Sequence, residues 1–364
     1  MAPPLKDNID ADVARVLAER FSAETDHFDA DSFVKTLTAG LPPLELKDRI
    51  NLVADQLAIE LPHHYPDALA LVVTVAESDV GGWASWTLCS FVERHGVEWP
   101  TESLEAMSTL TKFCTCEFAI RPFLEDHLEL TRTYLRRWVK DPDETVRRLA
   151  SEGTRPLLPW GPKVRALLED PSIGIEPLNH LYLDESETVR RSVANHLNDV
   201  AKADPDLVVE VLSGWMSQSS DVDDRMIRHA LRTLVKQGYP PALGLLGYTT
   251  EPELKVLSFV CNPDSIELGA SIELSAELRS TAKDDQLLVI DFVIHHVKAS
   301  GQTSPKVFKW TTSNLPAGET VMLTKKRTIQ TASTRRYHAG VHRVELQVAG
   351  TVVASTEFNL SNSS

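Results

Sequence analysis

Apolar residues recur at helical spacing through the first 250 positions and at strand spacing after them. The first part runs to "YPPALGLLG", and turn sequences such as "LPPLELKDR", "EDPSIG" and "KADPDL" divide it, which predicts one helix after another. The later part alternates in short runs, among them "SIELSAEL", "QLLVIDFVIHHV" and "HRVELQV". Six or seven such strands in about 110 residues are typical of an immunoglobulin-like β-sandwich. We therefore predict two domains, 1–250 and 251–364.

One motif repeats within the helical part. The stretch "DPDETVRRLASEGTRP" begins at Asp141, and "DESETVRRSVANHLND" begins at Asp184, 43 residues later. A weaker third copy, "DVDDRMIRHALRTLVKQ", begins at Asp221. This spacing lies within the roughly 40–47 residues of HEAT-like helical repeats. The sequence therefore predicts an α-solenoid of such repeats.

Each copy also carries signals for the start of a helix. Asp141 is expected to be an N-cap, with Pro142 at the first helical position and Glu144 completing a capping box. Asp184 and Glu187 repeat this arrangement without the proline.

The helices that follow have two distinct faces. In the second copy an apolar stripe at helical spacing predicts the core side: Val189, Val193, Leu197 and Val200. A polar stripe faces elsewhere: Arg191, Asn195, Asn198 and Asp199. In the first copy Arg148, Glu152 and Arg155 share a face in the same way. Because a solenoid lines up successive stripes on one concave surface, we expect a ladder of arginines with carboxylates between them.

Composition changes this picture in one respect. The net charge of −15 disfavours a polyanionic partner at long range. Residues 253–364 carry 12 Lys and Arg against 11 Asp and Glu, so the first 252 carry 25 against 41. Within that acidic part, basic residues gather around the repeated motif, which allows a local basic strip: Arg147, Arg148, Arg155, Lys163, Arg165, Arg190 and Arg191.

Other features of the composition predict an ordinary cytoplasmic protein. The N-terminus has no apolar signal-peptide core, and no window approaches the roughly 18 apolar residues of a membrane span. The four cysteines are scattered, with no second pair at zinc-ligand spacing, so we expect buried reduced thiols rather than a disulfide framework or a metal site.

Each candidate residue also has a purely structural interpretation. HEAT-like repeats use arginines structurally, and both Arg148–Glu152 and Glu117–Arg121 have the spacing of ordinary i to i+4 pairs. Asp199 differs, because it has no basic residue at that spacing. Three tryptophans have apolar neighbours and are expected in the core: Trp83, Trp86 and Trp138.

Three motifs in order make the chain resemble a known family. "TKFCTCEFAIRPFL", "VRRLASEGTRPLLPW" and "VRRSVANHLNDVAKADPD", followed by "LRTLVKQGYPPAL", are similar to the AlkC branch of the AlkC/AlkD HEAT-like-repeat DNA glycosylases. The resemblance covers essentially the whole chain, because a subset of that branch carries a C-terminal immunoglobulin-like domain. One departure is Leu157, where the family usually has an arginine.

The resemblance implies a hydrolase that excises alkylated bases such as 3-methyladenine and 3-methylcytosine from double-stranded DNA. It implies no cofactor or metal and no full flipping of the base, and we expect a monomer that is associated with the nucleoid when on DNA. By matching motif positions, the expected catalytic residues are Asp199, Glu117, Trp160 and Glu152. The expected DNA-binding residues are Arg147, Arg148, Arg155, Arg190, Arg191, Arg121 and Arg228, with Lys325, Lys326 and Arg327 in the sandwich.

Two alternatives to a glycosylase stay open. The solenoid could be a scaffold whose arginine ladder receives an acidic peptide, which predicts no preference for damaged DNA. It could also bind DNA structures without turnover, although the presence of both Glu117 and Asp199 argues against this.

Overall fold

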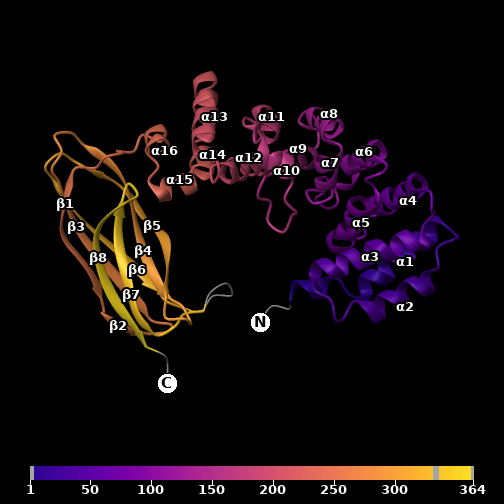
Figure 1. Cartoon of the computed structure of the whole chain (residues 1–364), viewed down its shortest axis with the longest axis horizontal. Helices are drawn as coiled ribbons and strands as arrows, with labels where there is room; N and C mark the ends of the chain where they lie inside the picture. Colours follow the sequence, from indigo (N-terminus) through magenta and orange to yellow (C-terminus); the bar gives the residue numbers. More distant parts are fainter. Residues whose placement is uncertain (1–3, 331–335, 362–364) are drawn as a thin grey trace. The chain divides into compact units, whose positions relative to one another are not determined.

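The computed structural model describes residues 4–330 and 336–361, and the chain forms two compact units. One unit contains the residues up to 200 together with 219–230, and the other contains 201–218 together with the residues from 231 onward. Along the chain a helical part precedes a β-sandwich, so the predicted fold class is confirmed (Figure 1). None of the described helices is long and apolar enough to cross a membrane.

The first unit is entirely helical in its described residues. After the short turn η1 (Leu5–Asn8), its helices are α1 (Ala11–Glu24), α2 (Ala30–Gly40), α3 (Leu46–Glu60), α4 (Tyr65–Glu77), α5 (Gly82–His95), α6 (Pro100–Leu110), α7 (Arg121–Asp126), α8 (Leu128–Trp138), α9 (Glu144–Glu152), α10 (Arg165–Glu169), α11 (Ser172–Leu181), α12 (Glu187–Val200) and α14 (Asp224–Ala230). The three sequence copies form α9, α12 and α14. Helix α12 packs against both of the others, which confirms the predicted repeat.

The apolar stripe of α12 lies in the core as predicted. Val189, Val193 and Leu197 are fully buried, and Val200 nearly so. The polar stripe is not uniformly exposed, however, because Asn198 and Asp199 near the end of the helix are also buried. Burying a carboxylate is costly unless it is paired, which directs attention to the partners of Asp199.

The expected N-cap of the first copy was wrong by two residues. Helix α9 begins at Glu144, and its N-cap is Asp143, whose carboxylate accepts a hydrogen bond from the Thr145 amide at 2.8 Å. Asp141 instead accepts the Asp143 amide at 2.9 Å. Likewise, Asp184 accepts the Ser186 amide at 2.9 Å before α12 starts at Glu187. In both copies the aspartate forms a local turn before the helix, which competes with capping.

The second unit holds three helices and the sandwich. The helices are α13 (Pro205–Gln218), α15 (Arg232–Gln237) and α16 (Pro240–Leu245). The strands are β1 (Leu254–Asn262), β2 (Ser265–Glu267), β3 (Ser271–Ser280), β4 (Gln286–Val297), β5 (Thr303–Leu315), β6 (Thr320–Thr328), β7 (Gly340–Val348) and β8 (Thr351–Ser361). They form two sheets, ordered β1-β3-β6 and β2-β8-β7-β4-β5, around one apolar core.

The helices that precede β1 pack on this sandwich. Leu243 of α16 is buried against Val289 and Ala349. Gly238, with φ of 69°, lies so close to Gly350 that an added Cβ would be 2.4 Å from the Gly350 Cα, which explains the need for glycine. The expected domain division between residues 250 and 251 stays a prediction, and α15 and α16 share a compact unit with the strands.

Candidate active site

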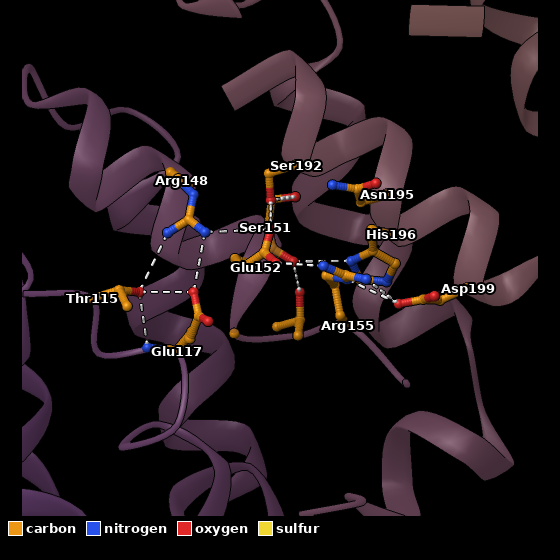
Figure 2. A network of polar contacts seen from close by, with 12 residues as sticks. Thr115, Glu117, Arg148, Ser151, Glu152, Arg155, Ser192, Asn195, His196 and Asp199 are labelled. Atoms are coloured by element: carbon orange, nitrogen blue, oxygen red, sulfur yellow. Dashed lines mark hydrogen bonds and ion pairs between the residues drawn. The ribbon is translucent and has the colours of Figure 1, made fainter. Parts of the chain in front are cut away.

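A chain of alternating acids and arginines crosses from the turn before α7, over α9, to the end of α12. In order, its members are Glu117, Arg148, Glu152, Arg155 and Asp199 (Figure 2). Three carboxylates and two guanidinium groups leave one net negative charge. Residues from three separate segments of the sequence thus form one cluster, which we call the acid–arginine chain.

Arg155 is the central link of this chain. Its Nε and a terminal nitrogen each lie 2.8 Å from Asp199 Oδ2, while the other terminal nitrogen donates to Glu152 Oε1. All three side chains are buried. Burial by itself would lower the pKa of Arg155, but the carboxylates of Glu152 and Asp199 outweigh it and raise that pKa above its ordinary value. The guanidinium therefore stays charged between its two acids.

Glu117 is held at the other end of the chain. Its Oε2 accepts hydrogen bonds from the Thr115 hydroxyl at 2.9 Å and from Arg148 at 3.1 Å. Arg148 also lies 3.8 Å from Glu152, so the expected i to i+4 pair is present. The partner expected for Glu117, Arg121, lies elsewhere, as described below.

Two buried side chains that sequence reasoning did not single out support the cluster from α12. The Ser192 hydroxyl donates to Glu152 Oε2 at 2.6 Å. His196 lies 3.0 Å from the Ser151 carbonyl through Nδ1, and burial lowers the pKa of His196 to about 4. The imidazole is therefore neutral at neutral pH, so Nδ1–H donates to that carbonyl. Both residues lie one or two turns before Asp199 on the same helix, and that helical spacing was the signal available in the sequence.

An open cleft of about 350 Å³ adjoins the acid–arginine chain. Its walls include Glu117, Glu152 and Arg155, and the aromatic rings of Trp86, Phe118 and Trp160. The Trp160 side chain is 63% exposed, so the cleft is open on that side. Apolar ring faces thus meet carboxylates in one site.

The role expected for two tryptophans needs correction. Trp138 is fully buried as predicted, but Trp83 and Trp86 are only half-buried, and Trp86 lines the cleft. Their apolar sequence neighbours pack into the core, while helical geometry turns the tryptophans outward. The sequence also gave no sign of a second aromatic group near Trp160, because Trp86 and Phe118 come from distant segments.

Trp160 is fixed by a residue that sequence reasoning missed. Its backbone adopts the left-handed region with φ of 64°, which is uncommon for a bulky residue. The Lys47 ammonium, from α3, donates to the Trp160 carbonyl and lies 4.9 Å from the centre of the Phe118 ring. Nothing in the sequence signals this contact, because 113 residues separate Lys47 from Trp160.

The arginine pairs divide into two structural classes. Arg147 binds Asp184 of the next copy at 2.6 Å and two backbone carbonyls before its own helix. Arg190 repeats this arrangement, with the Asp184 and Glu185 carbonyls and Asp223, 3.4 Å away. The first arginine of each pair therefore ties successive repeats together.

The second arginine of each pair is more exposed than the first, and we group it with Arg228, at the equivalent position of the third copy, as the outward arginines. The Arg148 side chain is 28% exposed, and those of Arg191 and Arg228 are 64% and 52% exposed. Arg191 and Arg228 have acids of their own helices, Glu187 and Asp224, at i to i+4 spacing. These three occupy equivalent positions on α9, α12 and α14.

Arg121 lies beneath the loop that carries Trp160. It is 1% exposed and donates to the carbonyls of Gly153, Arg155 and Pro162. Burial, and secondarily the charge of Arg155, lower the pKa of Arg121 to about 10. The expected pair with Glu117 is thus replaced by bonds that hold the loop.

The basic residues expected in the sandwich do not share one face of β6. Lys325 donates to the Trp310 carbonyl at 3.2 Å, and the Arg327 guanidinium lies 4.4 Å from the centre of the Phe308 ring. Lys326 between them points the other way and is exposed, as strand alternation requires.

Thiols and metal ligands contribute little to this site. The four cysteines are free; Cys114 is half-buried and lines the cleft, and the other three are buried. Within residues 4–330 and 336–361, no group of three or more His, Cys, Asp or Glu side chains could hold a metal ion.

Comparison with known families and structures places this site in context. The model of the DNA alkylation repair enzyme family matches residues 106–234, which include the whole acid–arginine chain. The model described as the C-terminal Ig-like domain of the uncharacterised protein YhaZ matches residues 255–362. The two matches follow the order of the helical part and the sandwich.

Two relatives match nearly the whole chain. YhaZ of Bacillus subtilis (strain 168) is 37% identical over 334 residues, 92% of each chain. The structure of the Pseudomonas fluorescens alkylpurine DNA glycosylase AlkC, bound to DNA containing an abasic site analog, is 36% identical, with a TM-score of 0.91. That match covers 99% of this chain and 100% of that one.

Proposed function

This chain belongs to the AlkC branch of the DNA alkylation repair enzymes, and we propose that it releases cationic alkylated bases, 3-methyladenine and 3-methylcytosine, from double-stranded DNA. The resemblance drawn from the sequence is confirmed, as is its assignment to the DNA glycosylases. The choice of substrates and the mechanism are the proposal.

The chemistry of the substrate decides what the site must supply. Alkylation at N3 leaves the base cationic, so it departs without prior protonation. The barrier then lies in forming an oxocarbenium-like deoxyribose, for which fixed negative charge and a positioned water are the useful groups. A strong general acid is not needed.

The acid–arginine chain is the observation that carries the proposal. Its net negative charge lies beside the cleft, in a largely buried setting where charge interactions are stronger than in water. We assign Asp199 to stabilising the oxocarbenium and positioning the water, Glu117 to the same task from the opposite end, and Glu152 to support. Trp160 rests against the sugar or the cationic base, a contact worth about 0.5–2 kcal/mol.

The outward arginines supply the DNA contacts in this proposal. Arg148, Arg191 and Arg228 lie on three helices that pack in succession, where they can bind phosphates on either side of the lesion. The inward positions of Arg147, Arg190, Arg121 and Arg155 favour structural tasks for these four, and their DNA contacts stay predictions.

The open cleft supports recognition without full flipping of the base. A site that is open along Trp160 can contact one face of a partly displaced base but cannot enclose it. Such an enzyme depends on the base's own leaving ability, so it should not release neutral bases.

The test is base release from two matched duplexes, one methylated to carry 3-methyladenine and one containing uracil. We expect free 3-methyladenine and no uracil. Release of uracil would contradict the mechanism, and release of neither would contradict the activity.

A further inference from the structure

One wall of the cleft, formed by Trp86 and Phe118, has no role in the mechanism above. Trp86 projects from α5, and Phe118 lies in the turn after Glu117; both line the cleft together with Trp160. The volume, about 350 Å³, falls at the lower end of the range for small-molecule sites, about 300–1,000 Å³. The cleft therefore has room for one flat ring system.

This wall is rigid. The rings of Trp86 and Phe118 stack at 5.6 Å with 15° between their planes, and Trp83 adds a tilted contact to Trp86 at 6.0 Å. The Lys47 ammonium lies over the Phe118 ring. Trp86 contacts two neighbouring rings and still lines the cleft, so it loses little conformational freedom when a ligand arrives, and the wall is already organised for binding.

The charges around the wall favour a flat cation over a neutral ring. Aromatic rings attract cations, and the carboxylates of Glu117 and Glu152 line the same cleft. Two cations are already near them: Arg155, which is paired with Glu152 and Asp199, and Lys47, which lies over the Phe118 ring. Trp86 is therefore the ring of this wall that we assign to a cationic ligand. Undamaged bases are neutral and lack this attraction. The aromatic rings of the cleft thus suit any planar base, while its carboxylates suit the positive charge that distinguishes a base methylated at N3 from its normal counterpart.

We propose that Trp86, backed by Phe118, is the surface against which the partly displaced methylated base rests, and that it determines the preference for a planar cation. This inference rests on the proposed function. A bicyclic purine covers more of such a wall than a pyrimidine does, so Trp86 contributes more to the release of 3-methyladenine than to that of 3-methylcytosine.

The test compares Trp86→Ala and Trp86→Phe with the unaltered protein in single-turnover release of both bases. The matched control is Trp99→Ala, which removes an exposed tryptophan that neither lines the cleft nor contacts Trp86 in the described structure. Thermal unfolding and affinity for undamaged DNA report any structural damage.

We expect Trp86→Ala to lower kcat/KM for 3-methyladenine by about 10- to 100-fold, the range of a lost base–aromatic stack. The loss for 3-methylcytosine should be smaller, Trp86→Phe should recover part of the activity, and Trp99→Ala should stay near the unaltered rate. Equal losses for both bases, or none, would overturn the inference while leaving the proposed function intact. No release by the unaltered protein would overturn both.

Discussion

Arg155 binds a single oxygen of Asp199 through two nitrogens, Nε and a terminal nitrogen, each 2.8 Å from Oδ2. A buried guanidinium held this way fixes the direction of the carboxylate. Because the same arginine also binds Glu152, it sets two acids of the site at once. We infer that Arg155 positions the acids in addition to neutralising part of their charge.

The variant Arg155→Lys tests this role. Lysine keeps the charge but cannot bridge both acids in one plane, so we expect kcat to fall by about 100-fold while DNA affinity changes little. The measurements are single-turnover release of 3-methyladenine and DNA affinity at several salt concentrations. A phosphate contact by Arg155 would instead lower the salt slope of DNA binding by about 1.

Substitution of the first and of the second arginine of a pair should have different effects. Arg147→Ala leaves Asp184 buried without its ion-pair partner, which costs about 3–5 kcal/mol in the free energy of unfolding. Arg191→Ala, at an exposed position, should change that free energy by less than about 1 kcal/mol but weaken DNA binding and lower its salt slope by about 1. Urea unfolding and DNA titrations measure both quantities. The reverse pattern would contradict the division into inward and outward arginines.

His196 makes stability depend on pH. Burial lowers its pKa to about 4, below the ordinary value of about 6.5, so between these values the unfolded chain binds a proton that the folded chain does not. The free energy of unfolding therefore falls as pH drops from about 6.5 to about 4, by at most about 3 kcal/mol at 1.36 kcal/mol per pKa unit.

The matched variant is His196→Asn, which keeps a donor for the Ser151 carbonyl but does not titrate. The charged groups around His196, which are Asp199, Glu152 and Arg155, are the same in both proteins. We expect the variant to lose less stability than the unaltered protein between pH 7 and pH 5, measured by urea unfolding. Identical pH profiles would show that His196 does not titrate in this way.

Lys47 should matter for catalysis through Trp160. Lys47→Met removes the donor to the Trp160 carbonyl and the cation over the Phe118 ring, so the left-handed turn at Trp160 loses its restraint. We expect a loss of about 10-fold in kcat, from misplacement of Trp160 in the cleft, with unchanged thermal stability. Lys35→Met, at an exposed position of α2, is the control. Equal activity of the two variants would contradict the restraint.

Lys326 is the residue of β6 with which to test DNA contact by the sandwich. Unlike Lys325 and Arg327, it is exposed and points away from the Trp310 and Phe308 side of the strand. If this edge meets DNA, Lys326→Glu should weaken DNA binding by about 10-fold or more at low salt. Lys283→Glu, in the turn between β3 and β4, controls for net charge. Equal affinities would remove β6 from the DNA-binding surface.

The sequence predicted the features that depend on the regular spacing of residues along the chain. The repeat placed α9, α12 and α14, and the stripe ending at Val200 identified the core face, because helical spacing alone determines both. Six or seven strands were predicted, whereas the described residues form eight; β2, with only three residues, is too short for a visible alternation.

The partners of the site residues could not be predicted in this way. Adjacent arginines such as Arg147 and Arg148 look alike in sequence, and only the neighbouring repeat decides that one binds Asp184 and the other Glu117. Trp86 meets Phe118, and Lys47 meets Trp160, across loops whose course no periodicity describes.

The most direct test is release of 3-methyladenine from methylated duplex DNA by the intact protein and by Asp199→Asn. Asp31→Asn, an exposed carboxylate of α2, is the control for the same chemical change. We predict that the intact protein and the control release 3-methyladenine. Asp199→Asn should still fold and bind DNA, but its rate of release should be lower by about 100-fold or more. Full release by Asp199→Asn would contradict the assignment of Asp199. No release by any of the three proteins would favour a scaffold whose arginine ladder binds a partner without catalysis.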